Sequence, residues 1–330
     1  SEAAGISPSI LTLQDANITQ GELWDFTFAP AFARINDDHY PDILSVADFN
    51  YTHYFINNQD GTFTNATDTD VIIDGNGMGS AVADYDNDGD LDWFVTSIDC
   101  ADESDCAGDI LSRVGNRLYR NTDGAFEDVT AEAGVESGGW GWGTCFLDVD
   151  NDGDLDIYHT NGWPINDAQN DFENDTSRLF VADGGGHFED RAAEYGLADT
   201  EQGRGVVCAD FDNDGDTDIL QLHRADDVAA TLWRNDVQGN NYLRIRLNGL
   251  APNTEATGAR VQVRYSGVTQ MREISTASNF ASQNPTLQIF GLGSATQVDE
   301  LTVDWPGGRQ TLLGNIQAGQ TLTIAHPDLE

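Results

Sequence analysis

Residues 84–92 read Asp-Tyr-Asp-Asn-Asp-Gly-Asp-Leu-Asp, and this acidic nonapeptide decides the fold because it recurs along the chain. Residues 148–156 and 210–218 repeat it, with changes at the second and eighth positions alone. A degenerate copy occupies residues 34–42, with arginine in the first position and histidine in place of glycine. Self-similarity at a nearly constant spacing marks a repeat architecture, so we expect copies of one structural unit.

Each acidic loop has surroundings that predict short β-strands. Residues 79–83 before the first loop are small or apolar, and residues 93–95 after it are apolar. Residues 118–126 then carry a hairpin signal around Asp123-Gly124. One unit thus holds four antiparallel strands in about 60 residues, which is the size of a propeller blade. We predict an all-β fold with a four-bladed, calcium-binding β-propeller over residues 1–240; a linear array of β-modules is the alternative.

The chain from residue 241 onwards has no acidic loop of this kind. Apolar and polar residues alternate over residues 242–247 and 261–265, which is the period of half-buried strands. We predict a small antiparallel β-sandwich-like domain over residues 241–330, docked on the last blade. Its arginines could form an anion or acidic-glycan patch, but pairing with the acidic propeller is favoured. These arginines are Arg244, Arg246, Arg260, Arg264 and Arg272.

The spacing of the aspartates predicts calcium sites. Calcium takes about 6–8 oxygen ligands, and alternate positions of a tight loop bring carboxylates to one side. Without a cation, several carboxylates a few ångströms apart strongly disfavour full ionisation. We expect three sites, and a fourth if the degenerate loop binds; Arg34 could instead stand there in place of a cation. The predicted ligands are Asp84, Asp86, Asp88, Asp90 (through its backbone oxygen) and Asp92; Asp148, Asp150, Asp152, Asp154 and Asp156; Asp210, Asp212, Asp214, Asp216 and Asp218; and, for the fourth site, Asn36, Asp38 and Asp42.

Two other interpretations of the loop are less consistent with the sequence. An EF-hand begins in the same way, but it needs a glutamate at position 12 and flanking helices. Position 12 here is Val95, His159 or Gln221, and the flanks are β-like. A merely solvated acidic turn is the other alternative, and three near-copies in register argue against it.

The amino-acid composition limits the classes of partner that this protein can bind. The chain has 57 acidic and 15 basic residues, a formal net charge of −42, and its basic residues are all arginine. Such a field repels nucleic acid and anionic membrane surfaces. Chemistry that needs lysine is excluded, and no apolar run is long enough to predict a membrane span. The first residues read as a mature end left after a leader was removed, or as an arbitrary boundary. We expect a secreted, periplasmic or cell-surface location.

Four cysteines are compatible with two disulfides in an oxidising compartment. Cys100 and Cys106 bracket a short acidic loop and could close a local bridge. Cys145 and Cys208 each precede an acidic loop on strands expected in neighbouring blades, and this second pairing is the less favoured one.

The repeats resemble the FG-GAP/VCBS family, the calcium-binding blades also seen in integrin α-subunit heads. The segment from about Asn241 to Ile324 resembles the ASPIC/UnbV domain. Cartilage acidic protein-like chains and many secreted bacterial proteins combine the two modules in this order. The family usually shows more than four repeats, so the resemblance implies that the ring is four-bladed or borrows strands. The residues that carry the C-terminal resemblance are 257–261, 270–272, 278–283, 290–293, 298–308 and 319–324.

A function is expected on the face opposite the acidic loops, where long connectors at residues 97–116 and 161–177 emerge. Enlarged loops on a rigid scaffold usually carry function. Our first hypothesis is a binding module for an extracellular protein or carbohydrate, with Trp140, Trp142 and Trp163 as the ligand surface. The alternative is an extracytoplasmic lyase, hydrolase or cyclase. A third is a stalk-like structural piece, and single tryptophans or histidines at blade ends are more often packing. The candidates for catalysis are His159, His223 and Arg204, gathered on one face together with Arg224.

Overall fold

A computed structural model describes residues 26–36, 38–99, 114–164, 172–224, 229–276 and 279–329, and this part of the chain is almost entirely β. Two four-residue helices, α1 (Thr130–Ala133) and α2 (Ala192–Tyr195), and two 3-10 turns, η1 (Phe172–Asn174) and η2 (Pro327–Leu329), complete it. The predicted all-β class is confirmed. Within these residues no helix is long and apolar enough to cross a membrane.

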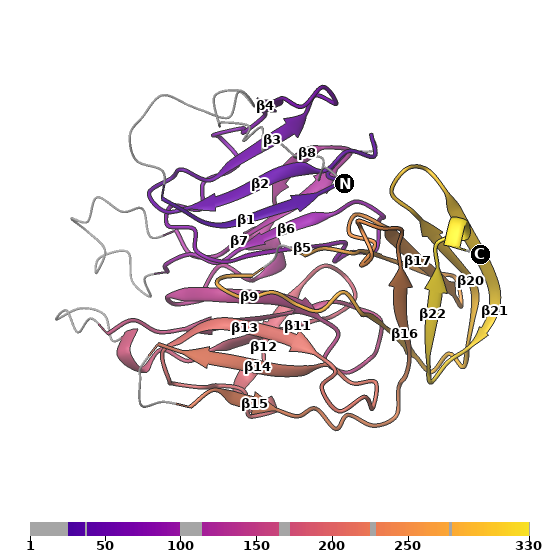
Figure 1. Cartoon of the computed structure of the whole chain (residues 1–330). Helices are drawn as coiled ribbons and strands as arrows, with labels where there is room; N and C mark the ends of the chain where they lie inside the picture. The colour runs from indigo at the N-terminus through magenta and orange to yellow at the C-terminus, as the bar shows by residue number, and fades with distance from the viewer. Residues whose placement is uncertain are drawn as a thin grey trace, which may run out of the picture.

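Four antiparallel sheets form the blades of the propeller, and in each sheet the strands follow chain order (Figure 1). The fourth blade has three strands in the described residues, where four were predicted. Blade 1 holds β1 (Thr27–Ala33), β2 (Asp42–Ala47), β3 (His53–Asn57) and β4 (Phe63–Asn65); blade 2 holds β5 (Ser80–Ala83), β6 (Asp92–Val95), β7 (Arg117–Thr122) and β8 (Ala125–Asp128). Blade 3 holds β9 (Gly141–Leu147), β10 (Asp156–Asn161), β11 (Arg178–Ala182) and β12 (Phe188–Asp190); blade 4 holds β13 (Gly203–Ala209), β14 (Asp218–His223) and β15 (Thr231–Trp233).

The innermost strands β1, β5, β9 and β13 each include alanine or glycine at points where neighbouring blades approach closely. A Cβ atom on Gly143 in β9 would lie 2.3 Å from the backbone oxygen of Arg204 in β13. A Cβ atom on Gly79, just before β5, would lie 2.1 Å from the backbone oxygen of Trp142. The glycine-rich entries to the blades are therefore required by packing between blades as well as by turns.

Large side chains from the middle strands fill the spaces between blades. Trp93, Tyr119 and Phe126 of blade 2 pack together, with Tyr54 of blade 1 against Phe126. Between blades 2 and 3 the buried residues include Phe94, Leu118, Ile157 and Phe180. This continuous apolar packing between adjacent sheets is the main favourable term holding the blades together.

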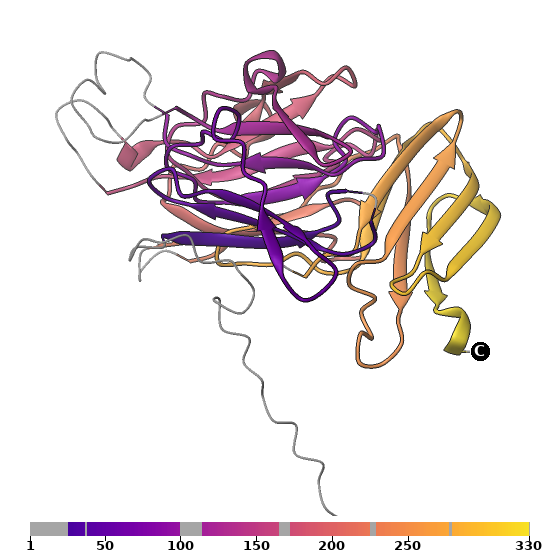
Figure 2. The same cartoon turned by 90° about the horizontal axis from the view of Figure 1, so that it is seen from above.

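The C-terminal part is a two-sheet sandwich beside the blades (Figure 2). One sheet has the order β19-β16-β22 and includes a parallel pair, β16 with β22; the other has the order β18-β17-β20-β21 and is antiparallel. Its core is a single apolar cluster with Phe290 and Trp305 at most 2% exposed. The strands are β16 (Asn241–Asn248), β17 (Arg260–Tyr265), β18 (Val268–Glu273), β19 (Gln288–Gly293), β20 (Gln297–Asp304), β21 (Gln310–Gln317) and β22 (Gln320–Ala325).

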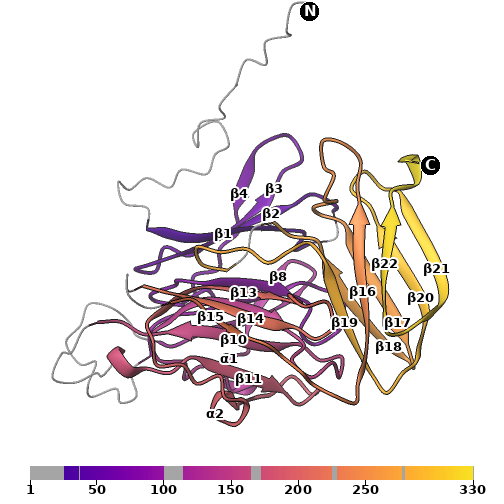
Figure 3. The same ribbon diagram turned by 60° about the horizontal axis from the view of Figure 1, so that its bottom comes forward.

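A segment of the sandwich enters the propeller and contacts the innermost strand of every blade (Figures 1 and 3). The segment lies between β18 and β19, and we call residues 279–284 the axial segment. Asn279 donates to the backbone oxygen of Val206 in β13, 2.9 Å away, and its backbone N–H donates to Ser80 in β5 at 2.8 Å. The Phe280 ring packs on Phe28 of β1 and on Trp142 of β9.

The axial segment also satisfies the free edge of β13. The backbone N–H of Val206 donates to Ser282 Oγ at 3.1 Å, and the backbone N–H of Cys208 donates to Asn284 Oδ1 at 2.9 Å. Two side chains therefore stand where a neighbouring strand would accept these hydrogen bonds. A loop of the C-terminal domain thus covers the inner edge of blade 4.

Candidate metal centres and ligand surface

The three intact acidic loops share one backbone conformation, which two residues in each loop make possible. The fourth position is left-handed at Asn87, Asn151 and Asn213, with φ of 60°, 58° and 68°. The sixth position is glycine, with φ of 99° at Gly89 and similar values in the other two loops. Asparagine and glycine tolerate φ above zero, so both bends are encoded locally. The left-handed asparagine in the fourth position was not predicted from the sequence.

The ninth aspartate of each loop has a structural role that does not require a metal. In blade 2, Asp92 accepts the backbone N–H of Tyr85 at 3.1 Å and that of Asn121 at 2.8 Å. Asp156 and Asp218 make the same pair of hydrogen bonds in blades 3 and 4. Asp42 does so in blade 1, although its loop is degenerate. This carboxylate therefore ties the acidic loop to the third strand of its own blade.

Carboxylate oxygens gather in each intact loop closely enough to hold one cation. In each of three groups, one oxygen per residue lies within 4.8 Å of the others. The remaining predicted ligands are outside these groups; Asp216, for example, accepts Asn151 Nδ2 at 2.8 Å. The groups are Asp84 with Asp86 and Asp92, Asp148 with Asp150 and Asp152, and Asp210 with Asp212 and Asp218.

Asp84 is the predicted ligand whose charge the protein compensates least. Its side chain is 1% exposed, and neither carboxylate oxygen has a hydrogen-bond partner among the described residues. Burial raises the pKa of Asp84 to about 7, and the nearby guanidinium of Arg272 and backbone N–H of Gly89 moderate that rise. A buried carboxylate without hydrogen bonds is costly unless a positive ion compensates it. Its oxygens lie in the same group as those of Asp86 and Asp92, so the donor set fits a hard divalent cation.

The first aspartates of the other two loops are more fully bonded. Asp148 accepts the backbone N–H of Asp152 at 3.1 Å and that of Gly153 at 3.0 Å. Burial raises the pKa of Asp148 to about 7, with a further contribution from the charge of Asp152. Asp210 accepts the Gly215 N–H at 3.0 Å. The three loops are therefore alike in backbone but different in how much of their negative charge the protein itself compensates.

The degenerate loop of blade 1 replaces the first aspartate by an ion pair. Arg34 Nε lies 3.2 Å from Glu273 Oε2 of β18, and Arg34 Nη1 lies 3.0 Å from His39 Nδ1. Arg260 binds the same Glu273 at 3.0 Å. His39 has φ of 67° where the intact loops have glycine. The Arg34 guanidinium is thus directed to Glu273 and His39, and its standing in the place of a cation stays a prediction.

Arginines of the sandwich reach the other three loops as well. The Arg272 guanidinium is buried and interacts electrostatically with both Asp84 and Asp148. Arg244 Nη1 forms an ion pair with Asp210 Oδ2. Gly153 and Gly215 at the loop bends approach Tyr265 and Tyr242 of the sandwich. The sandwich therefore docks on the acidic loops of all four blades, and the expectation of docking on the last blade alone was too narrow.

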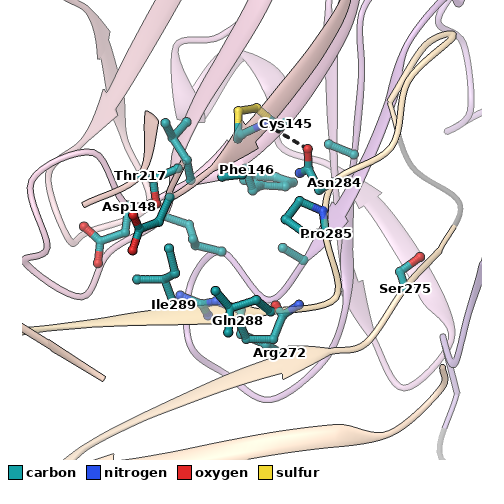
Figure 4. A pocket seen from close by; sticks show the side chains of 18 of the residues that line it. Cys145, Phe146, Asp148, Thr217, Arg272, Ser275, Asn284, Pro285, Gln288 and Ile289 are labelled. Carbon is teal, nitrogen blue, oxygen red and sulfur yellow. Dashed lines mark hydrogen bonds between the residues drawn. A yellow bond between two sulfur atoms is a disulfide. The ribbon is translucent and has the colours of Figure 1, made fainter. Parts of the chain in front are cut away.

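Where the sandwich meets the blades, a cavity of about 290 Å³ opens on the propeller axis (Figure 4). Its wall includes Asp148, Arg272 and Asn284, together with the disulfide that joins Cys145 of β9 to Cys208 of β13. The bridge fastens blade 3 to blade 4, so the less favoured of the two predicted pairings is present. Cys100 and Cys106 lie outside the described residues.

Two protein-family profiles match separate parts of this chain. The profile described as FG-GAP-like repeat matches residues 34–95, 104–159 and 168–220, together more than half of the chain, and each matched segment includes an acidic loop. The chain belongs to the FG-GAP-like repeat family. The profile described as ASPIC and UnbV matches residues 249–330, which contain most of the sandwich. Both modules of this FG-GAP chain are of the extracellular binding type.

Individual relatives of the FG-GAP chain are distant. Cartilage acidic protein 1 from Mus musculus is 38% identical over 97 residues, which is 29% of this chain and 13% of that protein. Among solved structures, the V. cholerae biofilm matrix protein Bap1 aligns with a TM-score of 0.33 at 11% identity, over 87% of this chain and 48% of that one. The chain thus spans a small part of the curated relative that it matches.

The face of the FG-GAP blades opposite the sandwich carries the three predicted tryptophans, which the structure brings together. Ring centroids lie 5.2 Å apart for Trp140 and Trp163 and 5.4 Å apart for Trp142 and Trp163, in stacked orientations. The Arg204 guanidinium lies 4.0 Å from the Trp142 ring centroid, and Arg224 lies 5.5 Å from that of Trp163. Trp142 is a core residue, whereas Trp140 and Trp163 are half-buried. We call this group the tryptophan face.

The buried donors of this face are incompletely paired. The indole Nε1 atoms of Trp140 and Trp163, and Nη2 of Arg204, have no hydrogen-bond partner among the described residues. Burial lowers the pKa of Arg204 to about 10, and the neighbouring charge of Arg224 lowers it further. Much of the two connectors predicted to flank this face lies outside the described residues.

The histidines proposed for catalysis occupy separate environments. His159 is fully buried between Phe94 and Phe180, its Nε2 lies 3.1 Å from Asn116 Nδ2, and burial lowers its pKa to about 3. His223 Nε2 pairs with Asp199 Oδ2 at 2.9 Å, and Nδ1 bonds to a backbone oxygen. Across the described ranges, no hydrogen bond or ring contact joins the two histidines to each other or to Arg204.

Proposed function

We propose that this chain is a calcium-stabilised binding module that recognises an extracellular protein or glycan from a secreted, periplasmic or cell-surface location. The observation that carries the calcium part is the buried carboxylate of Asp84, whose oxygens lack hydrogen bonds and lie beside those of Asp86 and Asp92. Calcium would be held by the three acidic groups, with the backbone oxygens at Asp90, Asp154 and Asp216 as further donors. It would supply positive charge and link each loop rigidly to its blade.

The sandwich and the tryptophan face lie at opposite ends of the blades, and this arrangement supports the proposal that the chain recognises a partner. The sandwich covers the ends of the blades that carry the acidic loops, through Arg244, Arg272 and the ion pairs of Glu273. The opposite end presents the tryptophan face, where aromatic rings and two arginines lie side by side. Half-buried tryptophan and arginine are the residues most often found at the centre of protein interfaces. Their flat rings equally suit the apolar faces of sugars.

Calcium titration of chelated protein tests the first part. We expect the thermal midpoint to rise with calcium, by mass action on the folded state, and to fall again on adding EDTA at low salt. An unchanged midpoint would remove calcium from the proposal. The tryptophan face is tested by Trp163→Ala and Arg224→Ala in binding to glycan arrays and to extracellular-matrix proteins, with Arg309→Ala in the distant sandwich as the matched control. Equal binding by all variants would exclude this face.

A further inference from the structure

A second cavity, of about 420 Å³, lies in the seam between blade 1 and the sandwich, away from the tryptophan face. Blade 1 contributes Phe32, Arg34, His39 and Pro41 to its wall. The sandwich contributes the turn between β20 and β21 and the ends of β17 and β18. This volume falls within the range of small-molecule sites, which are commonly built between domains. We call it the seam pocket.

The walls of the seam pocket are apolar and held in place. Phe32 is 50% exposed, the most exposed aromatic side chain among the described residues. The alternation of β1 places Ala31 and Ala33 in the core and leaves the Phe32 ring outside. On the sandwich side, Trp305 is fixed by a hydrogen bond from Nε1 to Thr311 Oγ1 at 2.9 Å and by edge contact with His326. Trp305 is 2% exposed, so it holds the sandwich wall in place, and Phe32 supplies the exposed ring. A rigid wall reduces the entropy lost on binding.

The charges at the pocket are already compensated. Glu273 is bound by Arg34 at 3.2 Å and by Arg260 at 3.0 Å, and its side chain is 5% exposed. A cationic ligand would therefore find no free carboxylate on the glutamate of this wall. An anionic ligand would have to enter against a net charge of −42, toward arginines whose charge is shared with Glu273. Both arguments favour a neutral ligand.

Hydrogen-bonding groups remain available around the apolar walls. A guanidinium can only donate, so His39 Nδ1 accepts from Arg34, and in the neutral ring the proton lies on Nε2. The hydroxyls of Thr257 and Thr276 also line the pocket. At the rim, a Cβ atom on Gly307 or Gly308 would meet no atom within 4 Å, so the mouth is open there.

We propose that the seam pocket binds a neutral, hydroxylated ring, that is, one sugar unit of a neutral glycan. The apolar face of the ring packs on the exposed ring of Phe32, and its hydroxyls exchange hydrogen bonds with His39 Nε2 and the two threonines. The rest of the glycan leaves past Gly307 and Gly308. This site adds to the proposed function and depends neither on calcium nor on the tryptophan face.

The test uses the full chain on an array of neutral, uronate-containing and amino-sugar glycans, followed by saturation-transfer NMR with the neutral glycans bound. We expect neutral glycans to bind, Phe32→Ala to weaken them about tenfold, and Thr257→Trp, which fills the pocket, to abolish binding. Phe49→Ala removes another exposed phenylalanine of blade 1 and should change nothing. Unchanged melting curves would exclude unfolding of the variants.

Three results would overturn the seam pocket as a sugar site. They are the absence of any neutral glycan that binds, equal binding by Phe32→Ala and the wild type, and preference for charged sugars. Loss of binding in Trp163→Ala with full binding in Phe32→Ala would support the tryptophan face and overturn the seam pocket. Loss in Phe32→Ala with full binding in Trp163→Ala would do the reverse, so the two proposals fail separately.

Discussion

Replacing Asp84 by asparagine should change the stability of the protein in opposite directions with and without calcium. In calcium-free protein, the raised pKa of Asp84, about 7 against an ordinary 3.8, means that burying the ionised form costs energy. A shift of about 3 units at about 1.36 kcal/mol each gives about 4 kcal/mol above pH 7. Asparagine carries no charge, but its unpaired amide costs about 1–3 kcal/mol. We therefore expect a net gain of about 1–3 kcal/mol for Asp84→Asn in EDTA at pH 8.

Calcium should reverse this sign. At a calcium concentration 1,000 times the dissociation constant, a site stabilises the folded state by about 4.1 kcal/mol, which exceeds the gain of about 1–3 kcal/mol from asparagine. Asparagine supplies an oxygen without the negative charge, so the variant should lose most of that stabilisation. The pH dependence gives an independent check in EDTA. A carboxyl whose folded pKa is raised stabilises the protein at low pH and loses this contribution as pH rises from about 4 to about 7. The advantage of asparagine should grow over that window and then level.

Denaturant unfolding of the wild type and of Asp84→Asn, at several pH values with EDTA or with calcium, measures these terms. Asp38→Asn is the matched control, because its loop has Arg34 in the first position and its carboxylate already accepts hydrogen bonds from Tyr40 and Gln59. It should change little in either condition. A loss of stability for Asp84→Asn in EDTA, or the same calcium response in both proteins, would refute the reasoning.

Three further outcomes follow from the contacts. Replacing Cys145 and Cys208 by alanine removes a disulfide that spans 63 residues. The unfolded chain then gains conformational entropy, so the free energy of unfolding should fall by about 4 kcal/mol in denaturant unfolding. No change would show that the bridge contributes nothing to stability. His159 is buried with a pKa near 3, so its contribution to stability is full above about 6.5 and is lost as pH falls toward 3. His159→Gln should remove part of this acid sensitivity in pH-dependent melting, and an identical profile would contradict the burial argument. Arg244→Ala leaves Asp210 without its ion-pair partner and should make the stability of blade 4 more dependent on calcium, seen as a larger rise of the melting midpoint on adding calcium; an equal rise would refute the pairing.

The blades were predictable because their information is local. Each acidic loop carries its own bends at asparagine and glycine, and each hairpin carries its own turn residues. The predicted strands at residues 79–83, 93–95 and 118–126 correspond to β5, β6 and the pair β7 and β8. The three oxygen groups fall within the nonapeptides for the same reason. A repeat that closes its own hydrogen bonds can be identified from a single sequence.

The interactions between modules were not predictable in the same way. Arg272 meets Asp84 and Asp148 across separations of more than a hundred residues, and nothing local distinguishes it from Arg264 on the neighbouring strand. The axial segment overlaps residues 278–283, which carry part of the ASPIC/UnbV resemblance, but that resemblance does not indicate contact with the blades. The role of the axial segment depends on the free edge of β13 and on a gap that exists only once four blades have assembled. Such roles belong to the tertiary arrangement and leave no periodic signal.

These long-range contacts imply that the propeller and the sandwich stabilise one another. Without residues 241–330, the backbone donors of Val206 and Cys208 would lose Ser282 and Asn284, and Asp84 and Asp148 would lose the nearby charge of Arg272. Without the blades, Arg272 would be a guanidinium with its compensating carboxylates removed. The proposed calcium ions and Arg272 would act on the same aspartates, because both reduce the repulsion among buried carboxylates. The acidic loops therefore couple the proposed metal binding energetically to the docking of the sandwich and to the covering of the free edge of β13. We expect the two modules to unfold cooperatively as a result.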